Sequence, residues 1–194
     1  MKMNFKFSAL VLVTAALSIV TPALAQDGMA KQGTAAQWND KGQLLQPVGY
    51  REWIFVGAPV TPNDLNDGKA AFPEFHDVYI EPTSWAQYKK TGEFPDGTII
   101  VKELVSVGAK SAPSGNGYFE GEFIGLEAAV KSADKHPKEP GNWGYYSFTQ
   151  PGAAPLKVTA LKATASCNAC HQASAKQDYV FTQYYPVLRA AGKH

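Results

Sequence analysis

The feature that most constrains this 194-residue chain is the string Cys167-Asn168-Ala169-Cys170-His171, which contains its only two cysteines. Two thiols three residues apart can form thioether bonds to the two vinyl groups on one edge of a porphyrin. The imidazole that follows is then placed to hold the iron from the proximal side. The spacing indicates a haem c bound covalently through Cys167 and Cys170, with His171 as the ligand of the iron.

Other uses of paired cysteines fit the chain less well. A disulfide-stapled exported domain would distribute several cysteines along its length. A structural zinc site needs four protein ligands, and scattered histidines would have to supply two of them. A thioredoxin-like redox pair remains the alternative, but it requires a strand before it in a βαβ unit. Residues 155–166 are rich in Ala, Thr and Lys and show no buried-strand pattern, so haem attachment is favoured.

The N-terminus has the pattern of a secretory signal peptide. Lys2 and Lys6 precede a short apolar stretch at 7–20, and Ala23-Leu24-Ala25 forms an A-x-A cleavage site. An apolar stretch of about 14 residues is shorter than the roughly 20 that span a bilayer. We therefore expect residues 1–25 to be removed and residues 26–194 to form one periplasmic mono-haem domain with no membrane span.

Composition narrows the class of protein further. The net charge of +1 is too small for the concentrated basic surface of a nucleic-acid-binding protein. The 45% hydrophobic and 12% aromatic content suffices for the core of one globular domain. We therefore expect no nucleic-acid partner and no second domain.

The residue patterns predict an α+β fold, a mainly antiparallel β-sheet with peripheral helices. Residues 82–91 fit a helix, because Pro82 suits a first turn and Gly92 a C-terminal stop. A second helix is expected at 173–185, before Pro186. Runs rich in aromatic and β-branched residues predict strands. These runs are 50–56, 78–80, 98–107, 118–130 and 143–148, with a loop at 108–117.

The second axial position of the iron decides between an electron carrier and a ligand-binding site. Met29 is the only methionine beyond the expected cleavage site, and a residue so near a chain terminus makes a poor fixed ligand. Three histidines remain, of which His136 lies in a polar loop, His194 is terminal and only His76 adjoins a predicted strand. A five-coordinate iron with an open site is favoured, and His/His ligation remains the alternative.

Lys102 lies inside the longest predicted strand. Strand alternation places it on one face with Ile100 and Leu104. An ammonium group on an apolar face must be paired, reach out to solvent or act in chemistry. Either an edge-strand lysine or a desolvated, nucleophilic amine fits this pattern.

Several segments of the chain, in the same order, resemble the cytochrome P460 family of ammonia- and methane-oxidising bacteria. The matching strings are YREWIFVGAPVTPNDLNDGKAAFPEFHDVYI, KKTGEFPDGT, VKELVSVG, GNGYFEGEFIGLEAAVK, PGNWGYYSF, CNACH and VFTQYYPVLRAA. The resemblance implies an antiparallel sheet, a homodimer and one haem per subunit. It also implies a covalent bond from a lysine nitrogen to a meso carbon of the porphyrin, and the VKEL string makes that lysine Lys102.

The same resemblance implies a reaction. The family oxidises hydroxylamine, with nitrous oxide as product in several members, and the expected route passes through an iron nitrosyl with an external electron acceptor such as a small cytochrome. Oxidation releases protons, so a distal base is expected. Glu127 resembles the family's pocket carboxylate and is expected to share a strand face with Phe123, although a solvated glutamate is the alternative. His76 is a further candidate lining residue.

The catalytic candidates are therefore Lys102, Glu127 and His76. Two other functions stay open. Similar proteins, the β-type cytochromes c′, share the sheet, lack the lysine cross-link and bind nitric oxide or carbon monoxide. A simple electron carrier would need a sixth protein ligand on the iron.

Overall fold

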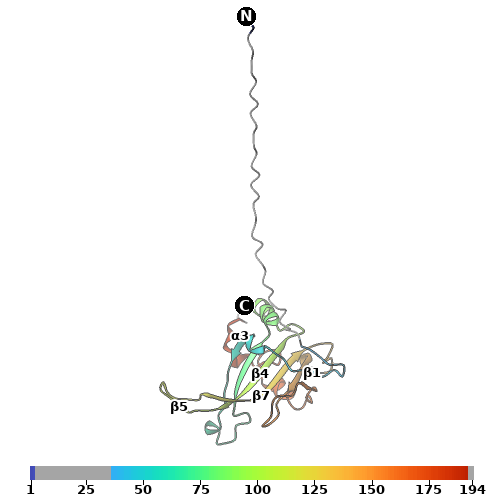
Figure 1. The fold of residues 1–194 in the computed structure, drawn as a ribbon. Helices are drawn as coiled ribbons and strands as arrows, with labels where there is room; N and C mark the ends of the chain where they lie inside the picture. The colour runs from blue at the N-terminus through green and yellow to red at the C-terminus, as the bar shows by residue number, and fades with distance from the viewer. Residues whose placement is uncertain (3–35, 192–194) are drawn as a thin grey trace. The chain divides into compact units, whose positions relative to one another are not determined.

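A five-stranded antiparallel sheet with the order β2-β3-β4-β7-β8 organises the chain (Figure 1). The computed structural model describes residues 1, 2 and 36–191. Most of the predicted signal peptide, Met29 and His194 lie outside these residues. The strands are β2 (Ile54–Gly57), β3 (Phe75–Ile80), β4 (Ile99–Val107), β7 (Glu120–Lys131) and β8 (Trp143–Ser147).

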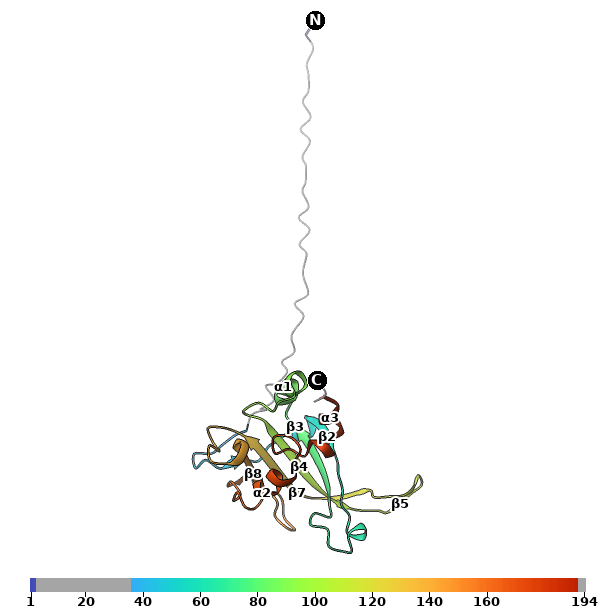
Figure 2. The same ribbon diagram turned by 180° about the vertical axis from the view of Figure 1, so that it is seen from behind.

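Smaller elements surround this sheet. Two short pairs, β1 (Leu44–Leu45) with β9 (Val158–Thr159) and β5 (Ser111–Ala112) with β6 (Gly115–Asn116), lie outside it. The β5–β6 hairpin projects beyond the ends of β4 and β7 in both ribbon views (Figures 1 and 2). The helices are α1 (Pro82–Thr91), α2 (Asn168–Ser174) and α3 (Pro186–Ala191), and single 3₁₀ turns occupy Tyr50–Glu52, Asn63–Leu65, Pro140–Asn142 and Thr182–Tyr184. The predicted α+β fold is confirmed.

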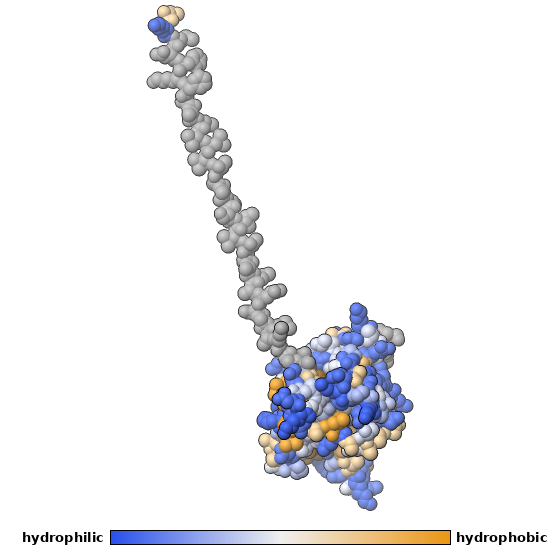
Figure 3. Space-filling view, turned by 90° about the vertical axis from the view of Figure 1, so that its right-hand side faces the viewer, coloured by the Kyte–Doolittle hydropathy of each residue, from blue (hydrophilic) through white to orange (hydrophobic). Residues whose placement is uncertain are grey.

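The two faces of the sheet bury separate clusters of apolar side chains. The helix-covered face packs against α1 and α3, and its cluster includes Val78, Ile100, Tyr145, Tyr88 of α1 and Leu188 of α3. The opposite face buries another cluster, which includes Leu44, Trp53, Val101, Leu126 and Tyr146. Because side chains alternate along a strand, neighbouring residues of β4 and β8 enter different clusters. Figure 3 shows one side of the molecule on which hydrophilic residues prevail and hydrophobic ones form small patches.

A β-bulge in β7 changes which residues share a face. Leu104 pairs with Gly125, but the next residue, Val105, pairs with Phe123, so Ile124 is the extra residue. Phe123 therefore lies on the opposite face, where the Arg51 guanidinium is 5.9 Å from its ring centroid. The prediction that Glu127 and Phe123 share a face is wrong, because a strand's alternation reverses across a bulge.

Helix α1 has the predicted bounds and clear end signals. The Glu81 carboxylate accepts hydrogen bonds from the backbone N–H groups of Thr83, at 2.8 Å, and Ser84. Pro82 follows as the first helical residue. The helix ends at Gly92, whose φ of 74° is in the left-handed region that glycine adopts without a Cβ clash.

The predicted strand at 50–56 is only partly correct. Residues Tyr50–Glu52 form a 3₁₀ turn after Gly49, and the strand begins at Ile54. The predicted 108–117 loop contains the β5–β6 hairpin.

The helix predicted at 173–185 is wrong. Helix α2 ends at Ser174, and a tight turn at residues 177–180 reverses the chain. The two central residues of this turn, Asp178 and Tyr179, have φ values of 43° and 61°. No glycine or asparagine marks the turn in the sequence, which is why the residue pattern did not reveal it.

Replacing Glu81 by alanine should lower the free energy of unfolding by about 1–2 kcal/mol, because two N–H groups at the start of α1 lose their acceptor. Urea unfolding followed by far-ultraviolet circular dichroism measures this loss. Glu93→Ala, an exposed change just beyond the same helix, is the control and should change stability by less than about 0.5 kcal/mol. Equal effects of the two variants would contradict the capping role.

Candidate functional site

Lys102 and Glu127 face each other across the two central strands. They are direct cross-strand partners of β4 and β7, and Lys102 Nζ lies 2.8 Å from Glu127 Oε2. The side chain of Lys102 is 26% exposed and that of Glu127 is 33% exposed. The pair sits on the helix-covered face, between the buried residues Ile100 and Leu104. The charged lysine predicted on an apolar face is therefore paired with the predicted carboxylate, and both groups stay accessible to a ligand.

An aromatic ring from the loop between β2 and β3 covers the amine. The ring centroid of Phe72 is 5.4 Å from Lys102 Nζ, within the range of a cation–π contact. Asp64 of the same loop is held by Lys110 Nζ at 2.7 Å and by the Tyr118 hydroxyl at 3.1 Å. The loop is thus fastened to the segment around the β5–β6 hairpin, with Phe72 over the ion pair.

His76 of β3 lies on the same side and is half-buried as a neutral ring. Its side chain is 18% exposed, and its ring centroid is 6.0 Å from that of Phe72. Burial lowers the pKa of His76 to about 4, and the positive charge of Lys102 adds to this effect. Glu74 Oε1 is 3.5 Å from Nε2 but makes no hydrogen bond to it, and no other described residue does. This buried nitrogen is therefore available to a ligand.

The two cysteines lie one helical turn apart at the start of α2. Cys167 precedes the first residue of the helix and packs against the helix-covered cluster, whereas Cys170 is exposed, and both thiols are free. Asn168 anchors the helix to the sheet, because its amide nitrogen donates to the Trp143 carbonyl oxygen at 2.9 Å. Figure 2 shows α2 beside β8.

His171 is oriented by one short hydrogen bond. Its Nδ1 lies 2.7 Å from the Tyr179 carbonyl oxygen. Because a carbonyl can only accept, Nδ1 carries the proton and Nε2 keeps its lone pair. The rings of Tyr145 and Phe181 enclose the imidazole at centroid distances of 4.4 and 4.7 Å. Burial lowers the pKa of His171, which favours the neutral form that binds a metal.

The predicted residues converge on one region. His76 pairs with Leu104, two residues along β4 from Lys102, and Tyr145, whose ring contacts His171, pairs with Ala129, two residues along β7 from Glu127. The charges of Lys102 and Glu127 accordingly influence the pKa of both histidines. His136 lies apart. It is 2% exposed, and its Nε2 is 2.6 Å from the hydroxyl of Tyr146, which belongs to the opposite-face cluster.

These residues fit a covalently bound haem. Two free thiols sit on one short helix, and the adjacent imidazole is held in the tautomer that leaves Nε2 free. Across the described residues, no three His, Cys, Asp or Glu side chains gather as a metal-binding group, and this includes Cys167, Cys170 and His171, which therefore do not form the start of a structural zinc site.

Three groups of the site were not predicted from the sequence. The Tyr179 carbonyl acts through its backbone, which residue type does not reveal. Tyr145 and Phe72 resemble any aromatic core residue until the fold brings them to His171 and Lys102. The Asp-Tyr dipeptide also lacks the Asn-Gly signature of a tight hairpin turn.

A family model described as Cytochrome P460 matches residues 47–182 of the chain. The matched range contains every residue of the site described above. No curated protein matches the chain.

Protonation of His76 should destabilise the folded protein as the pH falls. Above pH 6.5 the ring is neutral whether folded or unfolded, but between pH 6.5 and about 4 only the unfolded chain binds the proton. Acidification from pH 7 to 4.5 should therefore cost the wild type about 2–3 kcal/mol more than His76→Gln. Urea unfolding at both pH values measures the difference. Other groups, Asp77 among them, titrate in both proteins and cancel. The same pH dependence in both proteins would contradict a buried, neutral His76.

Proposed function

The chain belongs to the cytochrome P460 family of haem cytochromes, and from this premise we propose that it is a c-type cytochrome that oxidises hydroxylamine to nitrous oxide. The observation that carries the proposal is the placement of the Lys102–Glu127 ion pair on one sheet face with two half-buried, neutral histidines, His76 on the neighbouring strand and His171 against Tyr145. One histidine has its free nitrogen suited to iron. The other, with the carboxylate, is suited to moving protons.

Three residues of one segment would hold the haem. Cys167 and Cys170 would form the thioethers, and His171 Nε2 would bind the iron. When bound, the haem iron provides a site for a nitrogen ligand and a route for electrons to an external acceptor. The packing of Tyr145 and Phe181 against the imidazole restricts the plane of its ring.

Glu127 and His76 would take up the protons that the reaction releases. Conversion of two hydroxylamine molecules into one nitrous oxide and one water releases four protons and four electrons. Glu127 Oε2 is partly exposed and can accept a proton and pass it to solvent. His76 is neutral at neutral pH and its Nε2 makes no hydrogen bond to any described residue, so it can accept a second proton or orient the substrate.

We also propose that Lys102 forms the covalent bond to the porphyrin that is characteristic of the family. An amine must lose its proton before it can act as a nucleophile. Glu127 Oε2, at 2.8 Å, is placed to take that proton from Nζ. Replacement of a meso C–H bond by an N–C bond releases two electrons and two protons, so the step needs a two-electron oxidant such as a peroxide. The family resemblance and this geometry support the bond.

Export, dimer formation and electron transfer complete the proposal. Haem attachment to a C-x-x-C-H segment follows secretion, so the signal-peptide pattern at 1–25 supports a periplasmic location. No helix within the described residues has the length and apolar character of a membrane span. A homodimer and a small cytochrome as electron acceptor are proposed from the family resemblance.

Lys102→Arg should abolish the cross-link, because a guanidinium is not a nucleophile near neutral pH. After digestion of the wild-type holoprotein, mass spectrometry should find one haem joined to both the Cys167–Cys170 peptide and the Lys102 peptide. The variant should yield haem on the cysteine peptide alone, and its hydroxylamine turnover should fall at least tenfold. Lys90→Arg, which changes an exposed lysine of α1, is the control and should keep both the cross-link and the turnover. Cross-linking absent from the wild type would sink this part of the proposal.

Glu127→Gln should slow hydroxylamine oxidation about 10²-fold or more, because the amide keeps the size of the side chain but cannot accept the proton. Steady-state oxidation with a dye as electron acceptor measures the change. Glu122→Gln, an exposed glutamate of the same strand, is the control. Full activity of Glu127→Gln would remove this residue from proton transfer.

The absorption spectrum of the purified holoprotein would distinguish the proposed function from its two alternatives. A high-spin haem that binds nitric oxide and lacks both cross-link and turnover would indicate a gas-binding protein like the β-type cytochromes c′. A low-spin spectrum would indicate a sixth protein ligand, with His76 as the candidate, and hence an electron carrier.

A further inference from the structure

A strained turn supports the carbonyl that orients His171. Residues 177–180 close a two-residue hairpin turn, in which the Val180 N–H donates to the Gln177 carbonyl oxygen at 2.8 Å. Both central residues, Asp178 and Tyr179, have positive φ. Among β-turns, only the I′ type has positive φ at both central positions, and it prefers Asn-Gly.

Aspartate and tyrosine are energetically unfavourable at these two positions. A tyrosine in the left-handed region brings its Cβ against its own backbone, and such conformations persist only where the surroundings impose them. The Tyr179 ring packs on Gly141, where an added Cβ would lie 2.4 Å from the ring. The turn is therefore enforced from outside, which points to a role for its geometry.

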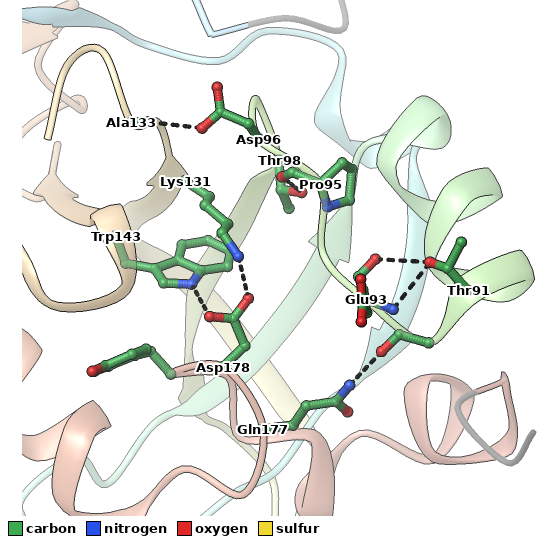
Figure 4. Close-up of polar contacts among 12 residues, drawn as sticks. Thr91, Glu93, Pro95, Asp96, Thr98, Lys131, Ala133, Trp143, Gln177 and Asp178 are labelled. Atoms are coloured by element: carbon green, nitrogen blue, oxygen red, sulfur yellow. Dashed lines mark hydrogen bonds and ion pairs between the residues drawn. The ribbon is translucent and has the colours of Figure 1, made fainter. Parts of the chain in front are cut away.

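The Asp178 carboxylate is the main anchor of the turn. Its Oδ2 accepts from Lys131 Nζ at 2.5 Å, and its Oδ1 accepts from Trp143 Nε1 at 3.3 Å (Figure 4). Lys131 is the last residue of β7 and Trp143 the first of β8, and the two are cross-strand partners. The rigid edge of the sheet thus holds the first central residue of the turn by both carboxylate oxygens.

The turn presents the Tyr179 carbonyl to two donors. His171 Nδ1 donates at 2.7 Å, and the Tyr145 hydroxyl donates at 3.3 Å. Two donors on one oxygen compete for its electron density. The hydrogen bond from His171 is therefore strengthened by whatever holds the carbonyl in place and weakened by the hydroxyl of Tyr145.

We propose that Asp178 is a positioning residue that, through the Tyr179 carbonyl, sets the electron donation of His171 to the haem iron, and that Tyr145 acts on the same carbonyl in the opposite sense. The inference rests on the proposed attachment of haem at His171. A stronger Nδ1–H···O=C bond makes an imidazole a better electron donor, which strengthens the iron–histidine bond and stabilises the oxidised iron.

Two substitutions in the holoprotein should act with opposite signs. Asp178→Ala frees the turn, so the iron–histidine stretching band of the ferrous protein should move to lower frequency and the midpoint potential should rise. Tyr145→Phe keeps the ring against His171 but removes the competing hydroxyl, so the band should move to higher frequency and the potential should fall. Resonance Raman spectroscopy and redox titration measure both.

Two further variants act as controls. Asp178→Asn keeps an acceptor for Trp143 and favours the left-handed conformation, so its shifts should be smaller than those of Asp178→Ala. Asp96→Asn alters a carboxylate whose Oδ1 accepts from the Ala133 N–H at 2.7 Å, outside the turn, so it should shift neither quantity (Figure 4).

Shifts of the same sign in Asp178→Ala and Tyr145→Phe, or no shift in either, would overturn the inference, because general damage to the pocket has no reason to act in opposite directions. If Asp178→Ala fails to assemble with haem, Asp178→Asn replaces it: shifts opposite in sign to those of Tyr145→Phe support the inference, and any other result overturns it. The outcome is independent of catalysis, because a protein that does not oxidise hydroxylamine would still show the opposed shifts. Failure to attach haem at all would instead refute the haem assignment.

Discussion

The register of strand β7 between β4 and β8 is the constraint on which the site depends. It sets Glu127 opposite Lys102, Ala129 opposite Tyr145 and Lys131 opposite Trp143. Because alternate residues of a strand point to one face, residues 127, 129 and 131 line up beneath the site. Strand β7 therefore carries Glu127 of the charged pair in its second half and, at its last residue Lys131, anchors the turn that orients His171. A shift of one residue would move all three to the opposite face.

The site combines charges with groups kept neutral. Lys102 and Glu127 can stay ionised on an apolar face because they form a 2.8 Å pair and remain partly exposed. The two nearby histidines lack this compensation, so burial holds their pKa values down and leaves their rings neutral. Neutral imidazole is the form that can bind a metal or accept a proton. The same burial thus keeps both rings in the neutral form that the proposed roles of His171 and His76 require.

The sequence predicted the parts of this site that residue type and spacing encode. The C-x-x-C-H segment, the helix that begins at Pro82 and the lysine on the apolar face follow from local patterns, and the family resemblance added Glu127. The sequence did not predict the extra residue Ile124 or the chain reversal at Asp178 and Tyr179. Both are local irregularities that tertiary packing imposes against intrinsic preference. Because of the bulge, Phe123 lies on the face opposite to the predicted one. The turn occupies residues where a helix was predicted.

Two histidines that each bury one ring nitrogen show why a chemical role depends on surroundings rather than on burial. His136 and His76 each leave one ring nitrogen without a hydrogen bond among the described residues. The ring of His136 is enclosed, with Nε2 on the Tyr146 hydroxyl and the Gly144 backbone against the ring, where a Cβ would lie 2.4 Å from Nε2. His76 instead adjoins a partly exposed ion pair beneath Phe72. A buried polar atom with no hydrogen bond calls for an explanation, and for His76 Nε2, which lies beside a partly exposed ion pair, the proposed function supplies one in a bound ligand.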